Sequence, residues 1–164
     1  MSAIISPCGQ YRYALSRPGD LAKPQKRAAL FVMLNPSTAD AEKDDPTIRR
    51  CRGFARLWGC DGLTVANLYA LRSTDPKALW SHPDPVGRDT DWHLAMLVAL
   101  HSEIVCAWGA NARQDRVDQV VSVLSSVGAN LMCLGTTKAG APKHPLYVPS
   151  AQKLITWSPQ PCPK

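Results

Sequence analysis

The alternation of short apolar runs with segments of helical periodicity constrains this fold most strongly. Four runs are apolar along nearly their whole length, which is typical of strands covered on both faces. They span residues 28–34, 63–66, 103–108 and 130–134. Because segments of helical spacing separate them, the pattern predicts a mostly parallel sheet with helices on both faces.

The intervening segments carry the start and stop signals of helices. Asp45 is the expected N-cap of the first helix, with Pro46 at the first helical position and Gly59 at its end. Two further helices are expected at residues 89–102 and 113–127. Each pair of consecutive buried strands is therefore expected to be joined by a helix.

The predicted fold class is α/β, with three layers (α/β/α) and a central, mostly parallel four-stranded sheet. An N-terminal β-hairpin or extra strand is expected at residues 11–17, which alternate in a strand-like way. A short helix is expected around residues 152–154. We expect a single domain over residues 1–157 and a frayed tail over 158–164, which contains three prolines.

The composition is that of an ordinary globular protein. Hydrophobic residues make up 45% of the chain and charged residues 20%, which excludes an intrinsically disordered protein. The apolar runs are too short to cross a membrane, and the N-terminus lacks the pattern of a secretion signal. We expect a cytoplasmic protein that has no membrane partner.

The cysteines do not form a metal-binding or cluster-binding pattern. No C-x-x-C occurs among the six, which are Cys8, Cys51, Cys60, Cys106, Cys133 and Cys162. They are expected to be free thiols in a reducing compartment. We predict no cofactor and no bound metal.

The net charge of +6 is concentrated near the two ends of the chain. Residues 1–27 and residues 138–164 each carry a net charge of +4. Basic surfaces attract polyanions, so the charge favours a nucleic-acid partner; the resemblance given below implies DNA rather than RNA. Basic termini are also common on solvated surfaces, so charge alone does not decide the partner.

Polar side chains follow the predicted strands at the edge where such sheets bind ligands. Asn35 after the first strand can orient a water molecule, but an amide cannot act as a base. Asp40 and Asp44 could supply that base, could hold Mg²⁺, or could be solvated loop charges. The turn that contains Asn35 also presents candidate ligand contacts at Pro36, Ser37 and Thr38.

Two later segments complete the candidate site. Asn67 ends the second strand, where its amide could select a pyrimidine edge or close an Asx turn, and Arg72 could hold a phosphate or make a surface ion pair. His144 could donate a hydrogen bond to developing negative charge. Its loop also contains ligand-binding or base-wedging candidates, namely Lys138, Lys143, Leu146 and Tyr147.

Four segments of the chain carry a resemblance to known families. Residues 31–40 and 44–51, with 8–13 and 144–147, resemble an uncharacterised family of bacterial and phage proteins. The order of features also resembles the uracil-DNA glycosylase superfamily. Asn35-Pro36-Ser37 resembles its water-positioning Asn-Pro-Gly motif, although serine replaces the glycine, and Asn67 resembles its pyrimidine-recognising Asn.

The same resemblance extends to the second half of the chain. Trp108-Gly109 is similar to a strand end of that superfamily, and His144-Pro145-Leu146 resembles a shortened His-Pro-Ser loop. The resemblance implies hydrolysis of the N-glycosidic bond of an altered or mismatched pyrimidine in DNA. Two alternatives stay open. One is a protein that binds a nucleotide or modified nucleic acid without cleaving it. The other is a metal-dependent phosphoester hydrolase built on Asp40, Asp44, Asp45 and His144.

Overall fold

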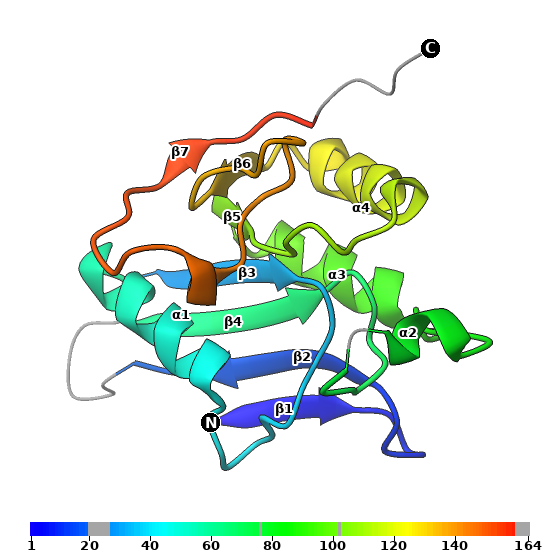
Figure 1. The fold of residues 1–164 in the computed structure, drawn as a ribbon. Coiled ribbons are helices and arrows are strands. Elements are labelled where there is room, and N and C mark those ends of the chain that lie inside the picture. The colour runs from blue at the N-terminus through cyan, green and yellow to red at the C-terminus, as the bar shows by residue number, and fades with distance from the viewer. Residues whose placement is uncertain (20–26, 76, 102, 160–164) are drawn as a thin grey trace.

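The computed structural model describes residues 1–19, 27–75, 77–101 and 103–159 (Figure 1). These residues form one sheet in the order β1-β2-β4-β3-β5-β6-β7. Its strands are β1 (Ser2–Ile5), β2 (Arg12–Arg17), β3 (Ala28–Met33), β4 (Gly62–Asn67), β5 (Glu103–Cys106), β6 (Asn130–Cys133) and β7 (Ile155–Thr156). The helices are α1 (Pro46–Leu57), α2 (Ala78–Ser81), α3 (Thr90–Ala99), α4 (Gln114–Ser126) and the 3₁₀ turn η1 (Pro145–Tyr147).

The predicted four-stranded sheet is wrong in its strand count, because the sheet has seven strands. The four apolar runs do form the parallel core β4-β3-β5-β6. Antiparallel strands extend it at both edges: the expected N-terminal hairpin of β1 and β2 on one side, and β7 on the other. Both outermost strands are short and largely exposed, so they lack the continuous apolar run that reveals a buried strand.

The helix expected around residues 152–154 is also wrong. That segment has no regular secondary structure and leads into β7, and Cys133 of β6 pairs with Ile155. Pairing with the edge of β6 satisfies backbone groups that a short isolated helix would leave to water. Of the predicted tail, residues 160–164 lie outside the described residues.

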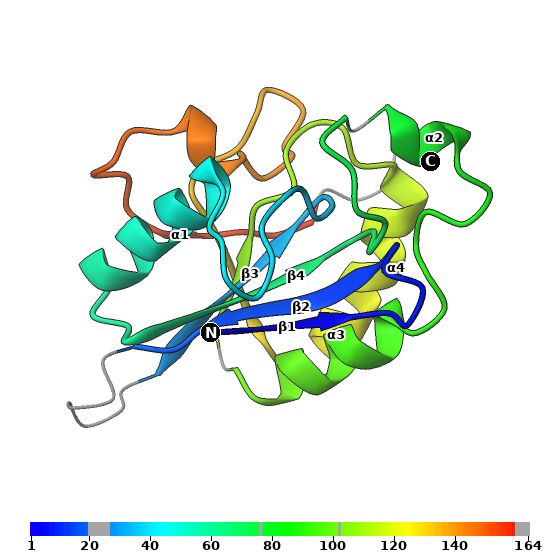
Figure 2. The same ribbon diagram turned by 90° about the horizontal axis from the view of Figure 1, so that it is seen from below.

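The helices lie on opposite faces of the sheet (Figure 2). On one face, Phe54 of α1 packs in a cluster with Phe31 and Val65. On the other, residues of α3 and α4 pack with Leu30 and Val32. Successive residues of β3 therefore contact different helices, which explains why this strand is apolar throughout.

The connections from β3 create a crevice at one end of the sheet. The chain passes from β3 to its neighbour β4 on one side and later returns to β5 on the other side. Loops leaving the carboxyl ends of β3 and β5 therefore run in opposite directions, and ligands of open α/β sheets bind at such a point. In the described part of the chain, no helix is long and apolar enough to span a membrane.

Candidate functional site

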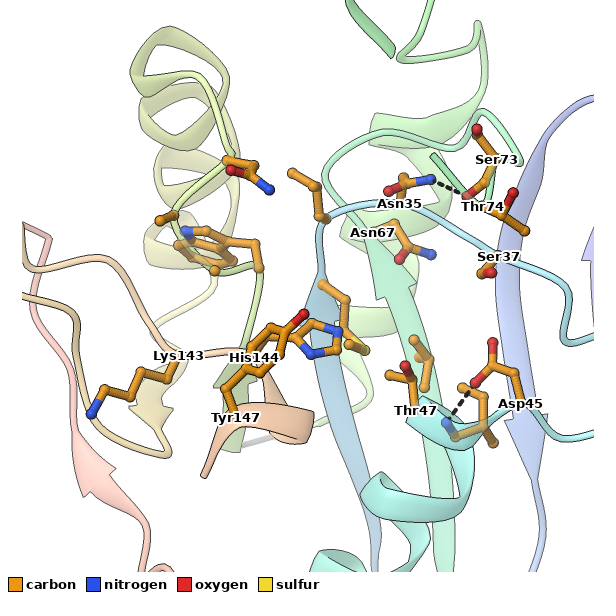
Figure 3. A pocket seen from close by; sticks show the side chains of 18 of the residues that line it. Asn35, Ser37, Asp45, Thr47, Asn67, Ser73, Thr74, Lys143, His144 and Tyr147 are labelled. Atoms are coloured by element: carbon orange, nitrogen blue, oxygen red, sulfur yellow. Dashed lines mark hydrogen bonds between the residues drawn. The ribbon is translucent and has the colours of Figure 1, made fainter. Parts of the chain in front are cut away.

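A cavity of about 480 Å³ lies at the carboxyl ends of β3, β4 and β5 (Figure 3). This size is within the range of small-molecule sites in proteins. The segment before β7 also contributes to its lining, through Lys143, His144 and Tyr147. Its lining includes Arg12, Asn35, Ser37, Asp45, Thr47, Asn67, Ser73, Thr74, Trp108, Gly109, Asn111, Lys143, His144 and Tyr147.

The structure brings together the three stretches that sequence analysis singled out. Asn35, Asn67 and His144 line the same cavity, although they are far apart in the chain. Three more of the predicted residues join them, namely Ser37, Lys143 and Tyr147. The remaining predicted residues lie outside the lining: Pro36, Thr38, Asp40, Asp44, Arg72, Lys138 and Leu146.

Asn35 is held in one orientation by the main chain. Its Nδ2 donates to the carbonyl oxygen of Ser73 at 2.9 Å and to that of Pro36 at 3.0 Å. Because both partners are acceptors, the amide nitrogen must face them and the side-chain oxygen must face away. In Figure 3 the oxygen of Asn35 points to the side opposite Ser73. The cavity therefore contains a fixed acceptor that can hold a water molecule.

Asn67 presents a buried amide in the cavity. It ends β4 and is only 3% exposed. Among the residues that the structure describes, none accepts a hydrogen bond from its Nδ2. A buried unsatisfied donor costs about 1–3 kcal/mol, so a ligand or water acceptor in the cavity would relieve that cost.

His144 is a neutral hydrogen-bond donor. Its Nδ1 accepts a hydrogen bond from the backbone N–H of Leu146 at 3.3 Å, which caps η1. Burial lowers the pKa of His144, and the opposing effect of Asp45 is smaller. With Nδ1 used as an acceptor, the proton of the neutral ring is on Nε2. The side chain can therefore donate one hydrogen bond to a ligand.

The loop that carries His144 is fastened to α1 by Arg50. The guanidinium donates from Nε to the carbonyl oxygen of Pro145 at 3.3 Å and from Nη1 to Ser150 Oγ at 2.7 Å. A third hydrogen bond reaches the carbonyl oxygen of Val148. Arg50 therefore fixes the position of the turn that presents His144 to the cavity.

The two carboxylates proposed as bases occupy other roles. Asp40 accepts hydrogen bonds from the backbone N–H groups of Glu42 and Lys43, which lower its pKa and close its own loop. Asp44 forms ion pairs with Arg17 at 2.6 Å and Arg52 at 2.8 Å. Neither Asp40 nor Asp44, the two expected catalytic carboxylates, lines the cavity.

Asp45 is the carboxylate that the cavity does contain. Its Oδ1 accepts a hydrogen bond from the N–H of Ile48 at 2.8 Å, as expected of the N-cap. Figure 3 shows its other oxygen pointing toward Ser37. Sequence analysis assigned Asp45 the capping role and a place among the ligands of the metal-dependent alternative, but no role in the glycosylase reaction, although an N-cap carboxylate has a second oxygen that remains available.

Sequence analysis also missed the cavity residues Arg12, Thr47 and Asn111. Thr47 comes two residues after the N-cap Asp45, and Asn111 comes two residues after the Trp108-Gly109 strand end. Both could have been predicted because they lie next to motifs that the sequence analysis already placed at the site. Arg12 could not, because it belongs to a strand outside the parallel core. Its place in the cavity depends on the pairing of β2 with β4.

The remaining candidates lie near the cavity mouth or away from it. Tyr147 is 81% exposed and Leu146 is 43% exposed, so both present apolar surface beside the opening. Lys138 is exposed. Arg72 donates from Nη1 to the carbonyl oxygen of Gly9 at 3.2 Å, which uses one of its donors within the protein.

The carboxylates and His144 do not assemble into a metal-ligand cluster. Within the described ranges, no group of three or more His, Cys, Asp and Glu side chains is arranged to hold a metal ion. The metal-dependent alternative required Asp40, Asp44, Asp45 and His144 to converge. Asp44 is instead paired with Arg17 and Arg52, and of the four residues only Asp45 and His144 are in the cavity lining.

Comparison with known proteins identifies one family. A family model described as "Protein of unknown function (DUF1643)" matches residues 12–146. No curated protein and no solved structure matches the chain. The matched range extends from Arg12 to Leu146, so it contains all the cavity residues named above except Tyr147.

Proposed function

We propose that this chain, which belongs to the DUF1643 family, binds a pyrimidine base of DNA in the cavity and hydrolyses its N-glycosidic bond. The substrate is an altered or mismatched base, and the enzyme is of the uracil-DNA glycosylase kind. Helices on opposite faces of the sheet support the three-layer arrangement that this kind of enzyme requires.

One observation carries the proposal. The buried amide of Asn67, whose Nδ2 has no acceptor among the described residues, lines the same cavity as the oriented Asn35 and the neutral donor His144. A pyrimidine has acceptor oxygens on its ring and needs a donor where it leaves as an anion. An amide, a fixed acceptor and a neutral imidazole meet those needs.

The reaction follows from these three groups and Asp45. A water molecule held by the Asn35 oxygen attacks C1′ of the deoxyribose, and the C1′–N1 bond breaks with its electrons moving to the base. The Nε2–H group of His144 stabilises the negative charge that develops on a carbonyl oxygen of the departing base. Asp45 accepts the proton from the water, since its second oxygen faces the cavity.

The base must leave the duplex to reach the cavity. Flipping costs a few kcal/mol, roughly, and exposed side chains at the opening can fill the space left behind. Leu146 and Tyr147 are exposed beside the opening and suit that role. Lys143 lines the cavity and provides positive charge for the DNA backbone.

The test is cleavage of defined duplexes. The purified protein is incubated with duplexes that contain uracil, hydroxymethyluracil or a mismatch, and alkali then breaks the strand at abasic sites. We expect strand breaks with at least one substrate. His144→Ala should reduce the rate more than Asn67→Ala, because departure of the base is the harder step.

Circular dichroism establishes that each variant is folded. A folded wild-type protein that cleaves none of these duplexes contradicts the glycosylase proposal. If it then binds DNA with an affinity that falls steeply with salt, the non-cleaving alternative takes its place.

A further inference from the structure

A β-bulge in β2 directs Arg12 toward the α1 side of the sheet. In the pairing of β1 with β2, Ile4 faces Ala14 but Ile5 faces Arg12, so Tyr13 is an extra residue. An extra residue shifts the alternation of side chains along the strand, and such bulges often re-aim a side chain near a site.

The consequence is visible in where the side chains of β2 lie. Residues 12 and 15 would face opposite sides of a regular strand. Leu15 packs in the cluster that contains α1, yet Arg12 lines the cavity that Asp45, the N-cap of α1, also lines. The bulge therefore places a guanidinium in the cavity.

Arg12 differs from the other buried arginines in its partners. Arg17 pairs with Asp44, and Arg116 pairs with Asp91. Arg12 is 2% exposed and donates from Nη1 to the carbonyl oxygen of Ala39, which carries no charge. Across the described part of the chain, its Nε has no hydrogen-bond partner and no carboxylate forms an ion pair with it.

The guanidinium stays charged despite its burial. Burial lowers the pKa of Arg12 to about 10, and the largest opposing effect comes from Asp45. At neutral pH the side chain is therefore still a cation. A buried cation that forms no direct ion pair is costly to maintain, and an anion that enters the cavity would offset that cost.

A second donor lies in the same cavity. Asn67 is 3% exposed, and its Nδ2 also has no acceptor among the described residues. Two buried donors that lack acceptors, one of them charged, line one cavity. Asp45 is the carboxylate among the lining residues, and its Oδ1 is used by the N–H of Ile48.

We propose that Arg12 forms a subsite for an anionic oxygen group, which the bound pyrimidine carries as a carboxylate on its ring. The planar fork of a guanidinium matches a carboxylate or a phosphate and is less suited to a neutral keto oxygen. Because Arg12 is only 2% exposed, a small ring substituent reaches it more easily than the DNA backbone does. The identity of the ring rests on the proposed function, whereas the anionic group does not.

The test compares small ligands that share one ring. Binding of 5-carboxyuracil, uracil and inorganic phosphate to the wild-type protein is measured by calorimetry and by the rise in unfolding temperature. We expect 5-carboxyuracil to bind about tenfold or more tightly than uracil, because a charge-assisted hydrogen bond is worth at least that factor. If uracil binds as tightly, the inference is overturned while base binding stands.

Three variants assign the effect to Arg12. Arg12→Gln should abolish the preference for 5-carboxyuracil over uracil. Asp45→Asn should strengthen binding of 5-carboxyuracil, because it removes a negative charge from the cavity and asparagine is also a good N-cap. Arg88→Gln, which removes an exposed positive charge outside the cavity, should leave the preference unchanged.

The outcomes separate this inference from the glycosylase proposal. Arg12-dependent binding of 5-carboxyuracil without cleavage of any duplex supports the subsite and contradicts the glycosylase activity. Cleavage of uracil duplexes at an unchanged rate in Arg12→Gln, together with no preference of the wild-type protein for 5-carboxyuracil over uracil, supports the glycosylase activity and contradicts the subsite. Arg12-dependent binding of phosphate without such a preference keeps an anion subsite but assigns it to a phosphate. Failure of all three ligands to bind overturns the inference.

Discussion

Asp44 and Asp45 are neighbours in the chain, but their carboxylates contact different partners. Asp44 forms ion pairs with Arg17 and Arg52. Asp45 caps α1 with one oxygen and lines the cavity. The same substitution at the two positions should therefore separate folding from catalysis.

Asp45→Asn should abolish most of the cleavage without destabilising the protein. Asparagine caps helices as well as aspartate does, but it cannot accept a proton from water. We expect the single-turnover cleavage rate to fall about 100-fold or more and the urea midpoint to stay the same. A variant that cleaves at the wild-type rate would show that Asp45 is not the base.

Asp44→Asn should have the opposite effects. Burial raises the pKa of Asp44, but hydrogen bonds from Arg52 and Arg17 outweigh it, so the pKa lies below its ordinary value and the carboxylate is charged. Removing that charge leaves the buried Arg17 uncompensated, and we expect a loss of about 2 kcal/mol of stability. Urea unfolding measures this loss. Cleavage per folded molecule should be unchanged, and a large decrease would restore Asp44 as a catalytic candidate.

Asn35→Ala should reduce cleavage about 100-fold, because it removes the acceptor that holds the attacking water. Asn35→Asp is the informative second variant. A carboxylate would repel the carbonyl oxygens of Ser73 and Pro36, which the amide nitrogen now contacts, so it should leave its present orientation. Single-turnover rates of both variants measure the effect. Wild-type activity in Asn35→Asp would mean that orientation of the amide is unimportant.

Arg50→Ala should slow cleavage by displacing His144. The side chain holds the turn after His144 through Pro145, Val148 and Ser150, so we expect about a tenfold lower rate with little change in DNA affinity. The ¹⁵N shifts of the His144 ring should change as well, which a purely stabilising role would not cause. Arg56→Ala, an exposed position at the end of the same helix, is the matched control.

The pH dependence should report the lowered pKa of His144. Burial lowers it below the ordinary value of 6.5, so the folded state resists protonation and the unfolded state does not. The contribution of His144 to the free energy of unfolding is therefore fully present above pH 6.5. It decreases as the pH falls from there through the pKa of His144 in the folded state. Cleavage should likewise be retained below pH 6.5 before it declines, since protonation of Nδ1 breaks its hydrogen bond with Leu146.

A His144→Gln variant isolates this contribution. His93, whose pKa burial also lowers, adds to the loss of stability at acidic pH but lies outside the cavity lining. The slope of unfolding free energy between pH 7 and 5 should therefore decrease in His144→Gln without reaching zero. An acidic limb of the cleavage profile centred above pH 6.5 would contradict the assignment.

Local sequence patterns were sufficient for the parallel core and for the ends of its strands. A strand covered on both faces must be apolar throughout, and Asp45-Pro46 has the dihedral and hydrogen-bonding preferences of a helix start. Parallel strands joined by helices deliver their carboxyl ends to one edge. For that reason the sequence pattern alone predicts that three residues of the cavity lie near one another, namely Asn35, Asn67 and His144.

Long-range contacts determined the rest. Arg17 and Asp44 meet across 27 positions and Arg50 and Ser150 across 100, and such contacts leave no periodic signal in the sequence. The same holds for the edge strands β1 and β7 and for the bulge that directs Arg12 to the cavity. Residue type therefore indicates which side chains are able to do chemistry. Which of them face the ligand depends on how distant segments pack.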